Sequence, residues 1–547
     1  MVAFLFNLVV MGAGAVYSYQ QAPHIPESFV GPDGERVATA EGIRTGKTVF
    51  QSDALMNHGS VLGNGAYYGV DYTAFALDRK TAAMRELYAE ERYGEPYDEL
   101  ASPDRAAADT TVREAFVERA GFFRTGEALG IEILQWLPFA LAKTYHIDLG
   151  ILWIATTWLG AGLFLPPLLT GTEPEGQARY VNVLLGALVV AVGGGFAGIW
   201  LGAQGYIEGP LWWLLGNEGL EYPEVGRVWQ FGLLAGFGLW AVLVARAFRP
   251  LLSRERPYGL AHTILYAGGS IGLLFVAGMF YTPQTNIVVT GFWRRWVVHM
   301  WVEGAFEFFI VAVVGLTLVS MNPLSRRSAE KAVAFEALFV IILFEAIDEY
   351  RALATAGEAF PYTLPFAFII ASGAWNFLGA GVLGFFITLP LVNYYEHGTD
   401  LTVGHAHAAM FGALGFLAVG MATYVLRIAS DPARWNGRRL RWSFWLRNAG
   451  LALMVFVSVL PVGFLQLETA FTEGYHAARS LAFYERDLVR LLFWARLPGD
   501  TMIVAGTLLY AYDGLRKRFV FRETTPLDGR SRVPAAGLRG LASEDDD

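Results

Sequence analysis

The chain has 547 residues and a formal net charge of −9; 54% of its residues are hydrophobic and only 17% are charged. Ordinary soluble domains contain about 25% charged residues, and the mean hydropathy here is +0.38. Basic residues occur in short clusters and never in one tract, which argues against nucleic-acid binding. The chain has no Cys, so disulfides, thiolate metal sites and Cys-linked cofactors are excluded. The composition predicts an all-α polytopic membrane protein.

Apolar stretches of about 20 residues recur along the chain, and each is long enough to cross about 30 Å of hydrocarbon as a helix. About eleven transmembrane helices are predicted, at 2–18, 138–168, 181–203, 228–248, 261–281, 296–320, 332–348, 362–391, 404–427, 445–467 and 489–512. The first stretch is followed by a poor cleavage site, so it is interpreted as a membrane anchor and not as a signal peptide.

Polar segments divide the chain into four predicted parts. Residues 1–18 form the N-terminal transmembrane anchor, and residues 19–125 form a water-exposed domain because no stretch of membrane length occurs there. Residues 126–515 form the transmembrane helix bundle. Residues 516–547 form a polar C-terminal tail that ends in LASEDDD.

The stretch HMWVEGAFE places three ionisable groups inside a strongly apolar segment: His299, Glu303 and Glu307. Their i, i+4, i+8 spacing puts them on one face of an α-helix. His and Glu one turn apart can bind a non-haem iron, and the second carboxylate can relay protons to it. A hydrogen-bonded His–Glu pair that staples two helices remains an equal alternative.

A second pattern is HxH in TVGHAHAAMFG, formed by His405 and His407. Residues two apart on a helix point about 200° apart, so the two imidazoles cannot bind one metal but can serve two cofactors on opposite sides. His146, in AKTYHIDLG, is a third buried His that could complete a bis-His haem site. Two helix-cap histidines at the interface are the simpler alternative for HxH.

Six stretches occur in the order found in one known family. They are GKTVFQSDALMNHGSVLGNGAYYGVDYTA, WLPFALAKTYHIDLGILWIATTWLGAGLFLPP, WRRWVVHMWVEGAFEFF, WNFLGAGVLGFFITLP, VNYYEHGTDLTVGHAHAAMFGALGFLAVG and FWLRNAGLALMVFVSVLPVG. With these stretches the chain resembles the nitric oxide reductases of the haem-copper oxidase superfamily, and most closely their quinol-type, single-subunit branch. The resemblance implies a helical bundle of the subunit I type with a soluble N-terminal insert.

The resemblance also implies roles for single residues. His146 and His407 would be the axial ligands of a low-spin haem b, and His405 the proximal ligand of a high-spin haem b. His299 and Glu303 would bind the non-haem iron. Glu307 would act in the proton path, and Glu221 would contribute to a calcium site beside the haem propionates.

The implied reaction is the reductive coupling of two NO to N2O and water, with two electrons and two protons. Quinol is the implied electron donor, and the inner (cytoplasmic) membrane of a prokaryote is the implied location. A related NO dismutase and a shortened, non-catalytic haem protein that serves as gas sensor or electron carrier are the alternatives. A homodimer is compatible with the resemblance.

Two family segments are missing from this sequence. The adjacent His-His pair that completes the iron site has no counterpart in AFEALFVIILFEAIDEYRALATAGEAFPYTLPFAF, and the HYxVE-type quinol segment is absent after RAGFFR. Of the implied quinol residues, only Asp500 is present. Either the full protein contains segments that this sequence lacks, or the protein is a naturally shortened homologue.

Oxygen reduction, the commoner activity of the superfamily, fits the sequence poorly. The oxygen-reducing members resemble one another in a Tyr four residues after the metal-binding His. Here that position is Glu303, and a carboxylate favours iron over copper.

Overall fold

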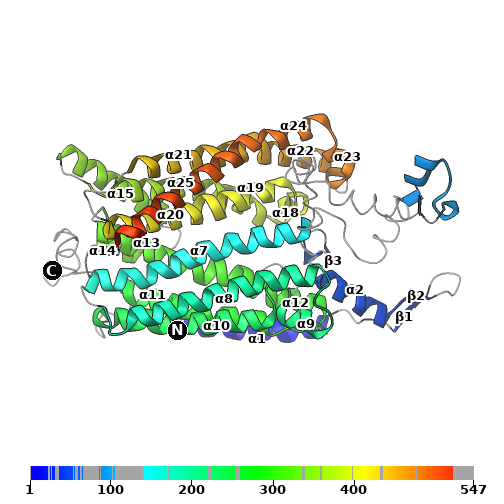
Figure 1. Cartoon of the computed structure of the whole chain (residues 1–547), viewed down its shortest axis with the longest axis horizontal. Helices are drawn as coiled ribbons and strands as arrows, with labels where there is room; N and C mark the ends of the chain where they lie inside the picture. The colour runs from blue at the N-terminus through cyan, green and yellow to red at the C-terminus, as the bar shows by residue number, and fades with distance from the viewer. Residues whose placement is uncertain are drawn as a thin grey trace.

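The structure is a computed structural model. It describes residues 2–22, 25, 27–30, 36–52, 55, 60–61, 64–65, 85–86, 88–90, 92–101, 103–104, 137, 139–170, 173–217, 224–252, 259–321, 323–334, 339–357, 360–396, 398–430, 435, 437–474 and 477–521. In these residues the long helices lie side by side with their axes roughly aligned and form an elongated bundle (Figure 1). The predicted all-α polytopic fold is therefore confirmed.

Eight helical segments in the described residues are long and apolar enough to cross a membrane. Four consist of one helix each: α7 (Phe139–Thr170), α8 (Gln177–Ala203), α10 (Arg227–Phe248) and α11 (Leu260–Phe275). A fifth, Gly304–Met321, covers the end of η5 (Trp296–Phe306) and α13 (Glu307–Met321), which follow α12 (Ile287–Arg295). The other three each join two α-helices through a π-helical segment: α16 (Thr363–Asn376), η7 (Phe377–Leu383) and α17 (Gly384–Thr388); α19 (Asp400–Ala406), η8 (His407–Gly415) and α20 (Phe416–Ala429); α21 (Gly437–Leu453), η10 (Met454–Val459) and α22 (Leu460–Thr472).

The three other predicted spans also fall in helices, with different bounds. The first is α1 (Val2–Gln21), which packs against α12 where Gly14 leaves room for a ring. The second, 332–348, corresponds in the described residues to α15 (Phe339–Thr355), which continues past the predicted end through Arg351. The third is divided between α24 (Asp487–Ala495) and α25 (Leu497–Phe521).

Burial separates central helices from outer ones. Of the most apolar 18 residues of α8, 17% are buried, whereas of residues Gly304–Met321, 78% are buried. The α13 helix therefore lies in the middle of the bundle, packed by fully buried rings such as Phe309 and Trp240. The α8 helix lies on the outside, where its apolar side chains face lipid.

The π-helical segments change the geometry expected for HMWVEGAFE. Most of that stretch lies in η5, whose i→i+5 hydrogen bonds place more residues in each turn than an α-helix does. The i, i+4, i+8 alignment predicted for a regular α-helix therefore does not apply unchanged. π-Helical segments are frequent at functional sites, and His407 also begins one, η8.

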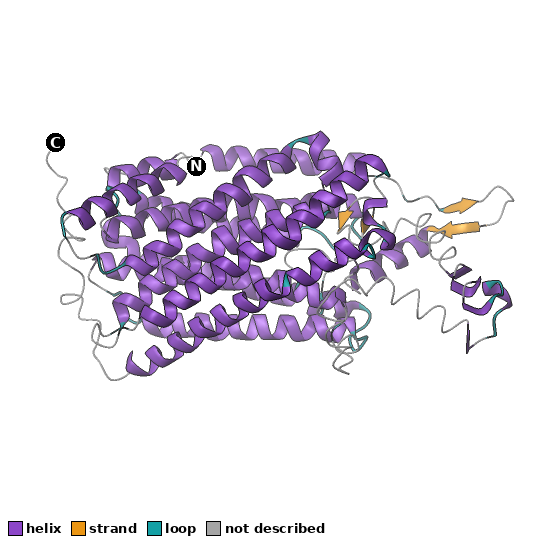
Figure 2. Cartoon of the chain, turned by 90° about the horizontal axis from the view of Figure 1, so that it is seen from above, coloured by secondary structure: helices purple, strands orange, loops and turns teal. Residues whose placement is uncertain are grey.

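Small elements of the predicted water-exposed domain lie beyond one end of the bundle, which we call the insert end (Figures 1 and 2). They are β1 (Ser28–Val30), β2 (Arg36–Thr39), α2 (Ala40–Ser52), β3 (Ser60–Val61), β4 (Asn64–Gly65) and the 3-10 turn η2 (Tyr97–Glu99). Strands β1 and β2 pair antiparallel, as do β3 and β4. Of the predicted domain bounds, 18/19 lies within α1 and 515/516 within α25 (Leu497–Phe521), whereas 125/126 lies outside the described residues.

One side chain ties this domain to the bundle. Lys47 Nζ of α2 donates hydrogen bonds to the carbonyls of Pro283 (2.7 Å) and Thr285 (2.5 Å), just before α12. Burial lowers the pKa of Lys47 to about 8. Next to it, Phe50 is buried in the main core.

Short helices cover the two ends of the bundle. At the insert end lie α9 (Pro210–Leu215), α18 (Pro390–Glu396) and α23 (Leu481–Tyr484), and α14 (Arg326–Ala334) lies with α15 at the other end (Figure 1). The helices α7 and α19 both begin at the insert end. This places His146, His405 and His407, which are all within the first turns, at similar depth.

Candidate functional site

Two predicted haem ligands face each other across the bundle. The ring centroids of His146 (α7) and His407 (η8) are 5.9 Å apart, and their planes differ by 29°. A metal–imidazole nitrogen bond is about 2 Å long. Two such bonds on opposite sides of one metal hold imidazole centroids at a comparable separation, so the pair fits axial ligation of a haem iron.

The hydrogen bond of His407 fixes which nitrogen is available. Its Nδ1 lies 2.9 Å from the carbonyl oxygen of Val403, one turn earlier in the same helix. A carbonyl only accepts, so Nδ1 carries the proton and Nε2 keeps its lone pair. A backbone carbonyl on the second ring nitrogen is the usual support of a metal-binding His.

His405 is supported in the same way by a different element. Its Nδ1 lies 2.9 Å from the carbonyl oxygen of Gly379 in η7, which again leaves Nε2 as the acceptor. Two glycines make this approach possible. A Cβ at Gly379 would lie 2.5 Å from the backbone nitrogen of Ala409, and one at Gly384 would lie 3.3 Å from Cε1 of His405. The HxH pair therefore contacts α7 on one side and η7 on the other.

An ion pair stands beside the two facing imidazoles. Arg496 Nε donates to Asp500 Oδ2 at 2.9 Å, and Arg496 also reaches Met454 Sδ at 3.4 Å. The charge of Arg496 acts on His146 and His407. Asp500, the predicted quinol residue, is thus held by Arg496. Sequence analysis missed Arg496, although its i, i+4 spacing to Asp500 in an apolar region was a usable signal.

A buried acidic pair includes Asp148, two residues after His146, and sequence analysis missed it as well. Asp148 of α7 is 4% exposed and Glu224 is fully buried. Thr144 Oγ1 donates to Glu224 Oε2 at 2.7 Å. Charged residues in AKTYHIDLGILW and YPEVG were visible in the sequence. Glu221, predicted as a calcium ligand, lies outside the described residues, which resume at Glu224.

The stripe that suggested an iron site is only partly described. His299 and Glu303 lie in η5, but their side chains are outside the described residues. Glu307 is half-buried at the first position of α13. Between them, Trp301 Nε1 donates to the carbonyl of Ile271 at 2.9 Å and anchors η5 to α11. Among the described side chains, no group of three His, Cys, Asp or Glu residues is suited to a metal, so the iron site remains a prediction.

Comparison with known proteins adds the family. Residues 120–347 and 339–502 match the family described as Cytochrome C and Quinol oxidase polypeptide I, and together they cover well over half of the chain. The chain belongs to this family. It is therefore a multi-pass membrane protein, and membership indicates haem and iron cofactors. The two matching segments meet at 339–347, the region in which the predicted His-His pair is missing.

The N-terminal region matches a second family model. Residues 26–126 correspond to the cytochrome c-like domain of NorB, a nitric oxide reductase subunit. Because the chain has no Cys, this region cannot attach haem through thioether bonds.

Three curated relatives show the extent of the similarity. The NorB subunit of the nitric oxide reductase of Stutzerimonas stutzeri is 26% identical over 432 residues, which are 70% of this chain and 87% of the relative. The cytochrome c oxidase subunit 1 homolog of Agrobacterium tumefaciens (strain T37) is 30% identical over 136 residues, 23% of this chain and 24% of the relative. A bacteroid homolog from Bradyrhizobium diazoefficiens is 28% identical over 142 residues, 23% of each chain. The longest of these similarities supports an oxidoreductase related to nitric oxide reductase.

Proposed function

We propose that the protein is a membrane nitric oxide reductase that converts two NO, two electrons and two protons into N2O and water. The observation that carries the proposal is the arrangement of His146, His407 and His405. The imidazoles of His146 and His407 lie with their centroids 5.9 Å apart. His405, two residues before His407, instead contacts the carbonyl of Gly379 in η7 through its Nδ1, so its Nε2 is available as well. The chain that contains them is 26% identical to a nitric oxide reductase subunit over 87% of that relative.

The residues divide the work as follows. His146 and His407 would hold a low-spin haem b, and His405 a high-spin haem b. His299 and Glu303 would hold a non-haem iron, and Glu221 would contribute to a calcium site. When bound, haem and iron supply one-electron redox chemistry and Lewis acidity toward NO.

The polypeptide would supply orientation and protons. The carbonyls of Val403 and Gly379 accept hydrogen bonds from Nδ1 of His407 and His405, which orients each ring and makes Nε2 the nitrogen that would bind a metal. Glu307, one turn beyond the iron-binding residues, would hold a proton for the forming water. Quinol is the proposed electron donor, with Asp500 near it. The inner membrane of a prokaryote is the proposed location, and a homodimer is the proposed assembly.

The missing His-His pair supports a second candidate, a shortened haem protein that senses gas or carries electrons without the non-haem iron. The helix α13 ends at the end of the bundle where α14 and α15 lie (Figure 1), and α16 follows α15 in the chain. An antiparallel helix pair can therefore be present or absent there without reversing the direction of the later helices. The mass of the native protein shows whether it contains a segment that this sequence lacks or is a shortened homologue. A value near 60.1 kDa would contradict an additional segment.

Replacing Glu303 by Ala tests the proposed reaction. The variant should lose NO turnover, because the iron loses its carboxylate, and should keep both haem spectra. Glu349→Ala, which removes an exposed carboxylate of α15, is the matched control and should turn over normally. Unchanged turnover in Glu303→Ala would defeat the assignment.

Gas analysis of the same preparation separates reductase from dismutase. A reductase produces N2O and consumes two electrons for each pair of NO. A dismutase converts two NO into N2 and O2 without an external donor.

A further inference from the structure

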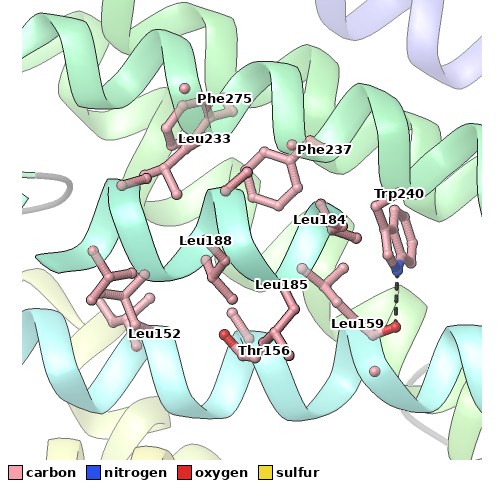
Figure 3. Close-up of a pocket in the computed structure, with 18 of the residues that line it drawn as sticks. Leu152, Thr156, Leu159, Leu184, Leu185, Leu188, Leu233, Phe237, Trp240 and Phe275 are labelled. Atoms are coloured by element: carbon pink, nitrogen blue, oxygen red, sulfur yellow. Dashed lines mark hydrogen bonds between the residues drawn. The ribbon is translucent and has the colours of Figure 1, made fainter. Parts of the chain in front are cut away.

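An apolar groove runs between α7 and α8, with α10 behind it (Figure 3). Its volume is about 260 Å³, and side chains such as Leu152, Leu188 and Phe237 line it. On α7 it extends from Asp148 to Leu163, which corresponds to about 22 Å along a helix axis. A groove of this length with an almost entirely apolar lining suits an extended hydrocarbon chain.

The groove opens toward lipid. Thr156 and Gly160 of α7 and Leu185 and Ala187 of α8 line it and are exposed. They lie on helices that span the membrane, and α8 is the least buried of the eight spans. A molecule that fills the groove therefore arrives from the bilayer, through an opening formed largely by small residues.

One polar group closes the insert end of the groove. Asp148 is 4% exposed, and its Oδ2 has no hydrogen-bond partner among the described residues. The neighbouring Glu224 already accepts a hydrogen bond from Thr144. A buried carboxyl oxygen without a partner is costly, so a ligand that donates a hydrogen bond at this point gains affinity.

We propose that this groove binds a membrane quinol, with the isoprenoid chain between α7 and α8 and a ring hydroxyl that donates to Asp148. The inference rests on the proposed function, for which it supplies the binding site of the electron donor. It places the ring two residues from His146, a proposed haem ligand. The site differs from the surroundings of Asp500, whose carboxylate is paired with Arg496.

Charge and shape favour a quinol over other lipophilic occupants. The anionic head of a phospholipid would be repelled by Asp148 and Glu224, two acidic groups buried together. A dissolved gas molecule such as NO has no hydrogen-bond donor for the unpartnered oxygen of Asp148. A quinol has a neutral head with hydroxyl donors and an apolar chain, which matches both ends of the groove.

Photolabelling of the full-length protein in lipid vesicles tests the proposal. The probe is a short-chain ubiquinol analogue, kept in its reduced form so that its ring hydroxyls can donate, that carries a photoreactive group; labelled peptides are located by mass spectrometry. Label is expected on peptides from α7 and α8. Thr156→Trp, at the exposed opening, should reduce labelling about tenfold without disturbing the core, and Leu188→Trp should do the same by filling the groove.

Three further variants sharpen the result. Val189→Trp is the matched control, because Val189 is next to Leu188 but is exposed and does not line the groove, and it should label as wild type. Asp148→Leu should weaken the analogue about tenfold through the lost hydrogen bond, whereas Asp148→Asn should retain most of the affinity.

Two outcomes would overturn the proposal. Label on α24 and α25 near Asp500 would move the quinol site there. Unchanged labelling in Thr156→Trp together with slower NO uptake would make the groove a gas route. Labelling needs no NO and is therefore independent of the reaction. If the wild-type protein formed no N2O with a soluble artificial electron donor, the proposed function would be contradicted, but the proposal that the groove binds quinol would not.

Discussion

His405 and His407 lie two residues apart on one helix, yet the structure gives them different surroundings. His407 faces a second imidazole, His146, at 5.9 Å, and its Nδ1 is held by a carbonyl of its own helix. His405 is held by a carbonyl of η7, and among the described side chains no second imidazole stacks against it. Under the proposed function, the first face would hold a metal with two protein ligands and the second a metal with one.

This difference shows that the neighbouring helices, and not the HxH motif, decide what each His can do. An iron with two imidazole ligands has no free position for a gas and suits electron transfer. An iron with one imidazole keeps a position for substrate. The sequence predicts two faces, but only the packing of α7 and η7 assigns a different role to each.

The largest effect is expected when His407, the histidine that faces His146, is removed. His407→Ala removes half of the facing pair, so the purified variant should lose the low-spin haem signal and about half of its haem. The high-spin signal should persist, because His405 and Gly379 are untouched. Visible spectra and a haem assay measure this. His262→Ala, a histidine of α11 that contacts Tyr266, is the control and should keep both signals. Retention of both haems in His407→Ala would contradict the assignment.

A smaller effect is expected on the surroundings of His405. In Gly379→Ala the new Cβ would lie 2.5 Å from the backbone of Ala409, so η7 must move away from η8 and take the carbonyl from His405. We expect a loss of about 2–3 kcal/mol in unfolding free energy and a changed high-spin spectrum, with the low-spin spectrum preserved. Gly381→Ala, whose Cβ would be 3.6 Å from its nearest neighbour, should change neither. A change in the low-spin spectrum alone would refute this interpretation.

The smallest effect concerns the turn that precedes both histidines. Burial raises the pKa of Glu396 to about 7 from 4.5, so the folded protein holds a proton there that the unfolded chain releases. This contribution to stability is complete below pH 4.5 and is lost as the pH rises through 7, on the order of 2 kcal/mol in total.

Thermal unfolding between pH 4.5 and 8 measures that contribution. Glu396→Gln cannot ionise, so its stability should vary less with pH than that of wild type. Glu468→Gln, an exposed position of α22, should retain the wild-type profile. Identical profiles for wild type and Glu396→Gln would show that this carboxyl does not titrate as described.

Most of the fold could be predicted because membrane helices are governed by one local property. A stretch of about 20 apolar residues is sufficient to identify a span, whatever it packs against. The end of the predicted span 332–348 was less accurate, because the helix α15 (Phe339–Thr355) continues beyond the apolar residues through Arg351. The π-helical turns at Trp296–Phe306 and His407–Gly415 could not be predicted, since they depend on the helices packed around them.

The candidate site divides in a similar way. His146, His405 and His407 could be proposed from residue type and spacing, because ionisable groups are rare in apolar helices. Asp148 and Glu224 were missed because their significance lies in partners more than 70 residues away in the sequence, such as Thr144 for Glu224. Arg496 was missed although its ion-pair partner Asp500 is only four residues away. The carbonyls of Val403 and Gly379, which orient the imidazoles, leave no mark in the sequence at all.

The metal content of the purified protein tests the central claim most directly. If the chain binds two haems and a non-haem iron, total iron and haem should be present in a ratio of about three to two. His299→Ala should lower this ratio to about two to two while it preserves both haem spectra. A ratio of two to two in the wild-type protein would contradict a nitric oxide reductase and indicate a haem protein without the non-haem iron.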